Sequence, residues 1–259
     1  MKNTVKTILE KKGVSKISMI TAYDALFASL ADRAGADIIL VGDSLGNAVL
    51  GYKNTVPVSL DMMAHHTAAV ARGTQNALVL ADIPFAVAHK NFDSLLSDTA
   101  RLVQQSGADA VKMEGGHKMA DKIAKLADAG IAVMAHIGLE PQQVLKMGGY
   151  RKFGKTEDER KRLLEDAKIL EQAGAFAVLL EMTDADTAAE ITASLSVPTI
   201  GIGSGAGCDG QVLVCTDILG LTKNPPKFVK QYADLDSIIV NAYSNFVDDV
   251  KNSRFPEGK

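Results

Sequence analysis

Four acidic residues and one histidine stand where apolar stretches of the sequence finish, namely Asp43, Asp82, Glu114, His136 and Glu181. If these stretches are neighbouring strands, at least three carboxylates converge, and they repel one another unless protons or a cation compensate their charge. Oxygen ligands with no cysteine among them favour Mg2+ over zinc. A Mg2+ site typically leaves positions for water and substrate, so the pattern indicates metal-assisted chemistry on a small molecule.

A lysine and a glutamate stand two positions apart in "AVKMEGG", residues 110–116. Side chains at positions i and i+2 of a strand share a face, so Lys112 and Glu114 point the same way. One explanation is an ion pair on a solvent-exposed edge strand, which contributes little to stability. The other is that both side chains face an active site. The polar residues at the ends of the other stretches favour this second explanation.

The elements that must position these residues are read from the hydrophobic pattern. Apolar runs of strand length alternate with stretches of helical periodicity at 59–73, 94–107, 118–130 and 159–174. We predict eight strands, within residues 16–23, 33–43, 77–85, 105–115, 128–138, 172–182, 197–203 and 211–217. Alternating strands and helices imply parallel strands, and eight of them in a chain of this length are typical of a (β/α)8 barrel. A doubly wound open sheet is the alternative.

Barrel enzymes hold their active sites at the carboxyl ends of the strands, and open α/β sheets use the same edge. The five polar residues are predicted to end strands two to six, so Lys112 and Glu114 are expected to face the barrel mouth. For Asp43 we keep a second explanation, in which its side chain only caps a helix that begins near Ser44.

Composition limits the other possibilities. Of 259 residues, 28 are Lys or Arg and 31 are Asp or Glu, and the net charge of -3 recommends neither nucleic acid nor an anionic membrane as a partner. The beginning of the chain lacks the apolar core of a signal peptide, so a cytoplasmic location is expected. Cys208 and Cys215 indicate neither a disulfide framework nor a zinc site. We expect one barrel domain over residues 1–259, whose amphipathic tail at about 227–259 covers the barrel or a neighbouring subunit.

A series of sequence blocks resembles the ketopantoate hydroxymethyltransferase (3-methyl-2-oxobutanoate hydroxymethyltransferase) family. The blocks follow one another in the order and at the spacing of that family, from about residue 16 to 230, and they are "VGDSLGNAVLGYKNTVPVSLDMMAHHTAAVARG", "ADIPF", "VKMEGG", "AHIGLEPQQV", "GGY", "LLEM" and "PTIGIGSGAGCDGQVLV". The resemblance implies a (β/α)8 barrel of the phosphoenolpyruvate/pyruvate-like superfamily. It also implies Mg2+ as cofactor and a homodecamer built from two pentamers.

The resemblance assigns roles to the residues of the predicted mouth. It places Asp43, Asp82 and Glu114 at the Mg2+ site. It implies that the 2-oxo acid substrate is contacted by Asp43, Ser44, Asp82 and Lys112.

Glu181 matches the family's proton acceptor, and His136 matches a histidine of the active site. The reaction so implied is hydroxymethyl transfer from 5,10-methylenetetrahydrofolate to 3-methyl-2-oxobutanoate, in pantothenate and coenzyme A synthesis. A metal that stabilises an enolate acidifies the C3 proton of the oxo acid, and the apolar neighbours of Glu181 are expected to raise its pKa toward that of a useful base.

Three other functions stay open from the residues. They are a Mg2+-dependent carbon–carbon lyase or phosphonomutase of the same superfamily, a non-catalytic metabolite-binding barrel, and an aldolase that forms an imine on Lys112. The chain also departs from the usual family pattern at Met182-Thr183-Asp184, Ser204, Ala135 and Glu140. These departures bear on loop conformation, and through it on folate affinity and rate, more than on the type of reaction.

Overall fold

The structure is a computed structural model that describes residues 2–257. The chain divides after Leu213 into two compact units, and each is described by itself. The second unit begins at Val214, earlier than the tail expected from about residue 227. The organisation as one domain with a helical tail stays a prediction.

The first unit is a closed barrel of parallel strands, each hydrogen-bonded to the next and the last to the first. The strands are β1 (Ile17–Thr21), β2 (Ile38–Val41), β3 (Leu78–Asp82), β4 (Ala110–Glu114), β5 (Val133–Gly138), β6 (Ala177–Glu181), β7 (Thr199–Ile202) and β8 (Gly210–Leu213). A ladder between β1 and β8 closes the sheet. The predicted barrel is confirmed, and the doubly wound open sheet is excluded.

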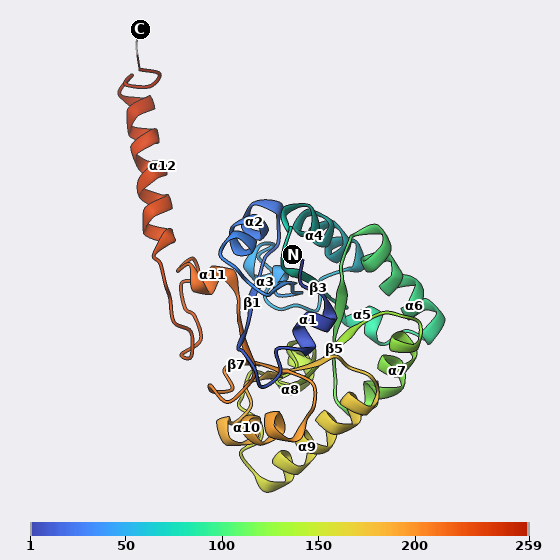
Figure 1. Ribbon diagram of the computed structural model, residues 1–259. Helices are drawn as coiled ribbons and strands as arrows, with labels where there is room; N and C mark the ends of the chain where they lie inside the picture. Colours follow the sequence, from blue (N-terminus) through green and yellow to red (C-terminus); the bar gives the residue numbers. More distant parts are fainter. Residues whose placement is uncertain (1, 258–259) are drawn as a thin grey trace. The chain divides into compact units, whose positions relative to one another are not determined.

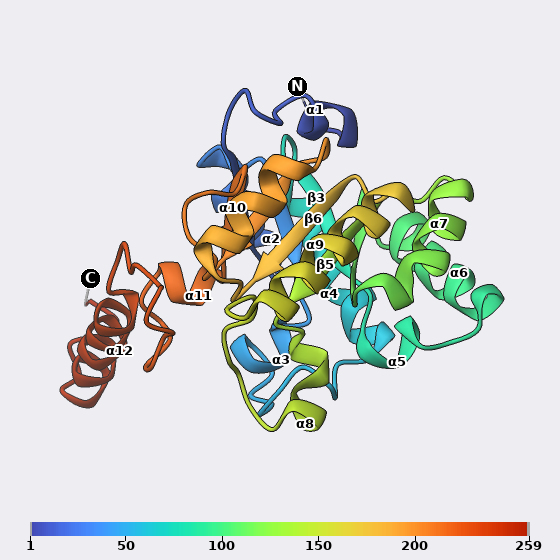
Figure 2. The same cartoon turned by 90° about the horizontal axis from the view of Figure 1, so that it is seen from below.

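Helices surround the strands, as Figures 1 and 2 show from two directions. The longer ones are α2 (Ala25–Arg33), α4 (Leu60–Gly73), α6 (Phe92–Ala100), α7 (Ala120–Asp128), α9 (Glu157–Gln172) and α10 (Ala185–Ser194). Five of them start where the sequence supplies a side-chain cap that accepts a backbone N–H of the first turn, at Asp24, Ser59, Asn91, Thr156 and Asp184. A π-helical turn, η1 (Arg101–Gln105), continues α6.

The core lies inside the barrel and at its amino-terminal end. β2, β3 and β4 are buried along their whole length, as expected for parallel strands that are covered on both faces. The short helix α1 (Val5–Leu9) contributes Ile8, which packs with Ile17, Leu78 and Phe176 in one apolar cluster. The amino-terminal end of the barrel is therefore filled by hydrophobic side chains.

Short helical turns follow the carboxyl ends of the strands. α3 (Leu45–Ala48) comes after β2, α5 (Phe85–Ala88) after β3, η2 (His117–Met119) after β4, and η3 (Pro141–Gln143) with α8 (Val144–Met147) after β5. These turns form the rim of the barrel end that carries the polar residues.

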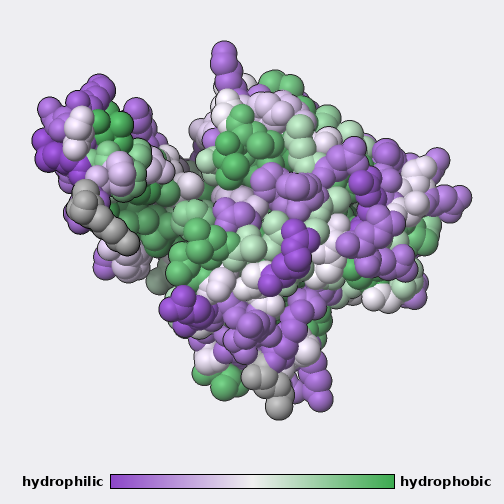
Figure 3. Space-filling view, turned by 90° about the horizontal axis from the view of Figure 1, so that it is seen from above, coloured by the Kyte–Doolittle hydropathy of each residue, from purple (hydrophilic) through white to green (hydrophobic). Residues whose placement is uncertain are grey.

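The second unit contains α11 (Cys215–Ile218) and α12 (Leu235–Lys251). The strand predicted to run to residue 217 ends at Leu213, opposite Ile20 of β1, and the chain turns into α11. α12 has no buried residue, and hydrophobic and hydrophilic residues lie together on the lobe at the left of Figure 3 that contains it.

Within residues 2–257, no helix combines the length and the apolar character needed to cross a membrane.

Candidate active site at the barrel mouth

The strand register brings the predicted site residues to one end of the barrel. Asp82 of β3 is paired with Lys112 of β4, and Glu114 of β4 is paired with His136 of β5. The prediction that Asp43 ends its strand is wrong, because β2 stops at Val41 and Asp43 follows it by two residues, whereas Glu181 is the last residue of β6 as predicted. The prediction that His136 ends its strand is wrong, because β5 continues to Gly138, which pairs with Glu181.

Asp43 and Asp82 are in direct contact, since the backbone N–H of Asp43 donates to Oδ2 of Asp82 over 3.0 Å. Burial, together with the negative charge of Asp82, raises the pKa of the Asp43 carboxyl to about 7. Burial also raises the pKa of Asp82, although the Lys112 ammonium opposes it. The capping explanation for Asp43 is wrong, because Ser44 is the N-cap residue of α3 and the Asp43 carboxylate instead accepts from Gln142.

Lys112 is enclosed by the acidic residues. Its Nζ lies 2.9 Å from Oδ1 of Asp82 and 3.2 Å from Nδ1 of His136, and the residue is only 4% exposed. Burial alone lowers the pKa of the ammonium, but the carboxylates of Asp82, Glu114 and Asp43 outweigh it and raise the pKa above its ordinary value. The exposed edge-strand explanation is therefore excluded. A permanently protonated amine is also a poor nucleophile, which argues against an imine on Lys112.

His136 lies between two glutamates, with Nδ1 3.6 Å from Oε1 of Glu114 and Nε2 3.4 Å from Oε2 of Glu181. Burial and the charge of Lys112 lower the pKa of His136 well below its ordinary value, so the ring is neutral. Because the Lys112 ammonium can only donate, Nδ1 accepts and the ring proton is on Nε2. That N–H is buried and makes no well-aligned hydrogen bond within the described residues. It belongs to the ring nitrogen that lies nearer to Glu181.

The Glu181 carboxyl has a raised pKa and is partly exposed. Burial raises the pKa of its carboxyl to about 8, and the negative charges of Asp43 and Asp82 add to this effect while Lys112 opposes it. Its side chain is 20% exposed, whereas that of His136 is 2% exposed. Glu181 is therefore the member of the pair that an incoming substrate can reach.

Ser44, which is half-buried, stands beside Asp43, and its Oγ lies 2.8 Å from the hydroxyl of Tyr23. Sequence analysis assigned no role to Tyr23, which follows β1 at the same end of the barrel. The position directly after a strand is the signal that could have drawn attention to it.

Gln142 was also missed. Its side-chain amide donates to Oδ2 of Asp43 over 2.8 Å and to the backbone oxygen of Ile83 over 3.0 Å, and its backbone N–H donates to Oε2 of Glu114 over 3.1 Å. The residue lies within the block "AHIGLEPQQV" and on the turn η3 that follows β5. A polar side chain on a turn after a barrel strand was the available signal.

The residue types of this site fit a hard divalent cation. Oδ1 of Asp82 is buried and accepts no well-aligned hydrogen bond, although the Lys112 ammonium lies beside it. Within residues 2–257, no three or more His, Cys, Asp or Glu side chains are grouped as a metal-binding set. Mg2+ usually takes one or two carboxylates and fills the other positions with water and substrate oxygens, so the two contacting residues Asp43 and Asp82 could hold it.

The loop after Glu181 and the loop after β7 each contain a departure from the family pattern, and the two contact each other. The hydroxyl of Ser204 accepts from the backbone N–H of Thr183 over 2.9 Å and donates to the backbone oxygen of Leu180 over 2.7 Å. Met182, which lies between Leu180 and Thr183 in the sequence, has a positive φ of 47°, which is uncommon for a residue other than glycine. Ser204 therefore holds the backbone on both sides of Glu181.

Solved structures of other proteins share this fold. The chain resembles phosphonopyruvate hydrolase, solved in complex with oxalate and Mg2+, with a TM-score of 0.64, 15% identity, and coverage of 98% of this chain and 89% of the other. It resembles 2,3-dimethylmalate lyase, a member of the PEP mutase/isocitrate lyase superfamily, with a TM-score of 0.62, 18% identity, and coverage of 100% and 91%. These likenesses show that the chain has the α/β barrel fold of these proteins.

The sequence comparison is more specific. A family model described as ketopantoate hydroxymethyltransferase matches residues 2–258. The 3-methyl-2-oxobutanoate hydroxymethyltransferase of Caldivirga maquilingensis is 52% identical over 98% of this chain and 96% of its own length, and that of Carboxydothermus hydrogenoformans is 51% identical over 99% and 94%. This chain belongs to the ketopantoate hydroxymethyltransferase family.

Proposed function

We propose that the barrel mouth transfers a hydroxymethyl group to 3-methyl-2-oxobutanoate. The one-carbon unit of 5,10-methylenetetrahydrofolate and one water are consumed, and 2-dehydropantoate and tetrahydrofolate are formed, as a step of pantothenate synthesis. Family membership over nearly the whole chain supports this reaction, and it decides against the lyase, phosphonomutase and non-catalytic alternatives.

The observation that carries the proposal is the pairing of a reachable base with a buried positive charge. Glu181 has a pKa raised to about 8 by burial and is partly exposed, and its charge is balanced in part by Lys112. Glu181 removes the proton from C3 of the oxo acid. Lys112 offsets the negative charge that develops on the substrate, and Nε2 of His136 lies 3.4 Å from Oε2 of Glu181, beside the base.

Asp43 and Asp82 would hold the Mg2+ ion, and Glu114 is a third carboxylate near enough for their charges to act on it. When bound, Mg2+ supplies Lewis-acid stabilisation of the negative charge on the oxo acid, which acidifies its C3 proton. Burial, and then the charge of Asp43, raise the pKa of Glu114 well above its ordinary value, although Lys112 opposes them. The positive charge of Lys112 therefore does not fully compensate the carboxyl groups of this site. Ser44, beside Asp43, is positioned to contact the substrate carboxylate.

The remaining parts of the proposal concern the setting of the reaction. We propose a cytoplasmic enzyme that works as a homo-oligomer, a decamer as the family resemblance implies. The exposed hydrophobic residues of α12 support association with further copies.

Exchange of the C3 proton of 3-methyl-2-oxobutanoate in deuterated water tests metal and base together and needs no folate. We expect exchange with Mg2+ and little exchange after chelation, followed by formation of 2-dehydropantoate once the folate is added. NMR of the oxo acid measures the exchange. Full exchange in chelator-treated protein would contradict the metal assignment, and exchange without product formation would contradict the transfer reaction.

A further inference from the structure

Gln142 connects the ends of three strands that carry the acidic residues. Its side chain reaches Asp43, beyond β2, and Ile83, directly after Asp82 of β3, and its backbone reaches Glu114 at the end of β4. Residues at or just beyond the ends of three different strands are thus held by one residue on the turn after β5.

The hydrogen-bonding capacity of Gln142 is matched to this task. A side-chain amide has two N–H donors, and both are used, one on a carboxylate and one on a backbone oxygen. The residue is 5% exposed, so water does not compete for these donors. A hydrogen bond to a buried carboxylate is charge-assisted and stronger than one between neutral groups.

We propose that Gln142 is a positioning residue, which fixes the carboxylates of Asp43 and Glu114 in the orientation that binds a divalent cation. The amide holds Oδ2 of Asp43, so the plane of that carboxylate is set, while the contact with Ile83 fixes the turn that follows Asp82. The backbone N–H holds Oε2 of Glu114 in the same way. This inference rests on the proposed function, because it assumes a cation at these carboxylates.

The substitution Gln142→Met tests the proposal, since methionine has a similar length and volume but no donor. Binding of Mn2+ to the full chain, with the metal as the only ligand, is measured by electron paramagnetic resonance. We expect Mn2+ to bind about 10-fold to 100-fold more weakly, which is the usual cost of removing a residue that orients metal ligands. Gln143→Met is the matched control, because Gln143 is half-buried on the same turn and no role is assigned to it.

A purely structural role gives a different result. It lowers the thermal unfolding midpoint of Gln142→Met and leaves the Mn2+ affinity of the folded fraction unchanged. If Gln142→Met does not fold, Gln142→Asn keeps an amide that is too short to reach both acceptors, and the same weakening is expected. A folded variant with Mn2+ affinity within twofold of the wild type overturns the inference alone. Failure of the wild type to bind Mn2+ overturns the metal part of the proposed function, and the inference with it.

Discussion

The ammonium of Lys112 lies 2.9 Å from Oδ1 of Asp82, and the two residues are register partners on adjacent parallel strands. Both are buried, so solvent screens neither charge. In such a place the loss of one partner leaves the other charge uncompensated, which typically costs roughly 3–5 kcal/mol. Lys112 therefore supports the fold of the mouth as well as any bound substrate.

Substitutions of Lys112 separate these two roles. Lys112→Arg keeps the charge, but the planar guanidinium is larger and does not fit the same position, so turnover should fall while Mn2+ binding is retained. Lys112→Met should lower the free energy of unfolding by roughly 3–5 kcal/mol, measured with denaturant.

No reduced adduct on Lys112 is expected by mass spectrometry after incubation with the oxo acid and borohydride. Detection of that adduct would show an imine mechanism.

The acidic cluster predicts an unusual dependence of stability on pH. The pKa values of Asp43 and Glu181 are raised by burial to about 7 and about 8. In the unfolded chain both groups titrate near pH 4, so between about pH 4 and about pH 8 these two carboxyl groups bind more protons in the folded state than in the unfolded state. His136, whose pKa is lowered by burial, opposes this effect only below about pH 6.5. Stability in chelator should therefore fall as pH rises through this range, and Mg2+ should restore it increasingly at the higher pH. Thermal unfolding midpoints with and without Mg2+ measure the effect.

Asp82→Asn is the control for that experiment, since it removes one of the converging charges and one cation ligand. The variant should lose less stability on going to high pH and gain less from Mg2+. A wild-type midpoint near pH 8 that does not respond to Mg2+ would contradict the metal site. Asp32 does not interfere with this measurement. Backbone hydrogen bonds outweigh its burial and lower its pKa, so its contribution to the stability of the fold is lost only below about pH 4.

Much of the fold was predictable because barrel strands and their helices follow local periodicity. Asp82, Glu114 and Glu181 end their strands as expected, since an apolar run that stops at a charge is visible in the sequence. His136 was misplaced by two residues, because the end of β5 depends on its pairing with β6. Gln142 was not found, because its partners are distant in sequence and are brought together only by the closed barrel.

The exposed face of α12 predicts self-association. Ile238, Tyr243, Phe246 and Val250 are each about half exposed or more, at 59%, 70%, 53% and 47%. We expect light scattering to report a large homo-oligomer, and Phe246→Glu to lower its mass because a charge in an apolar interface is costly to bury. A monomeric wild type at micromolar concentration would contradict the proposal. Asp236→Lys, which changes a polar residue in the first turn of the same helix, is the control.

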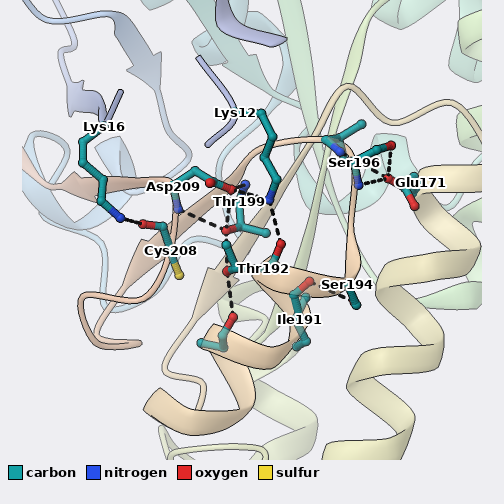
Figure 4. Close-up of polar contacts among 12 residues, drawn as sticks. Lys12, Lys16, Glu171, Ile191, Thr192, Ser194, Ser196, Thr199, Cys208 and Asp209 are labelled. Carbon is teal, nitrogen blue, oxygen red and sulfur yellow. Dashed lines mark hydrogen bonds and ion pairs between the residues drawn. The ribbon is translucent and has the colours of Figure 1, made fainter. Parts of the chain in front are cut away.

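A polar network at the other end of the barrel predicts a change in stability without a change in catalysis (Figure 4). Nζ of Lys12 donates to Oδ2 of Asp209 and to the backbone oxygen of Thr192, both over 2.7 Å. Lys12→Met should lower the free energy of unfolding by roughly 1–3 kcal/mol, because the acceptors lose a charged donor. Lys11→Met breaks a more exposed pair with Asp37 and should cost less. Turnover per folded molecule should match the wild type in both variants.

The assignment of Glu181 as the base is tested by Glu181→Gln. Glutamine keeps the shape and a hydrogen-bonding group near His136 but cannot accept the C3 proton, so exchange at saturating Mg2+ and oxo acid should fall on the order of 100-fold to 10,000-fold. If Glu181 only balanced the charge of Lys112, glutamine would weaken binding and leave saturated exchange nearly intact.

The pH profile of exchange gives a second, independent test of the same assignment. A base acts in its deprotonated form, so exchange should rise with pH and level off above the pKa of Glu181. Burial places that pKa at about 8, and a bound cation lowers it toward the ordinary value of 4.5 because positive charge favours the carboxylate. The midpoint should therefore lie between these values, and the rising limb should vanish in Glu181→Gln. A residual rate in the variant with the wild-type midpoint would show that another group takes the proton.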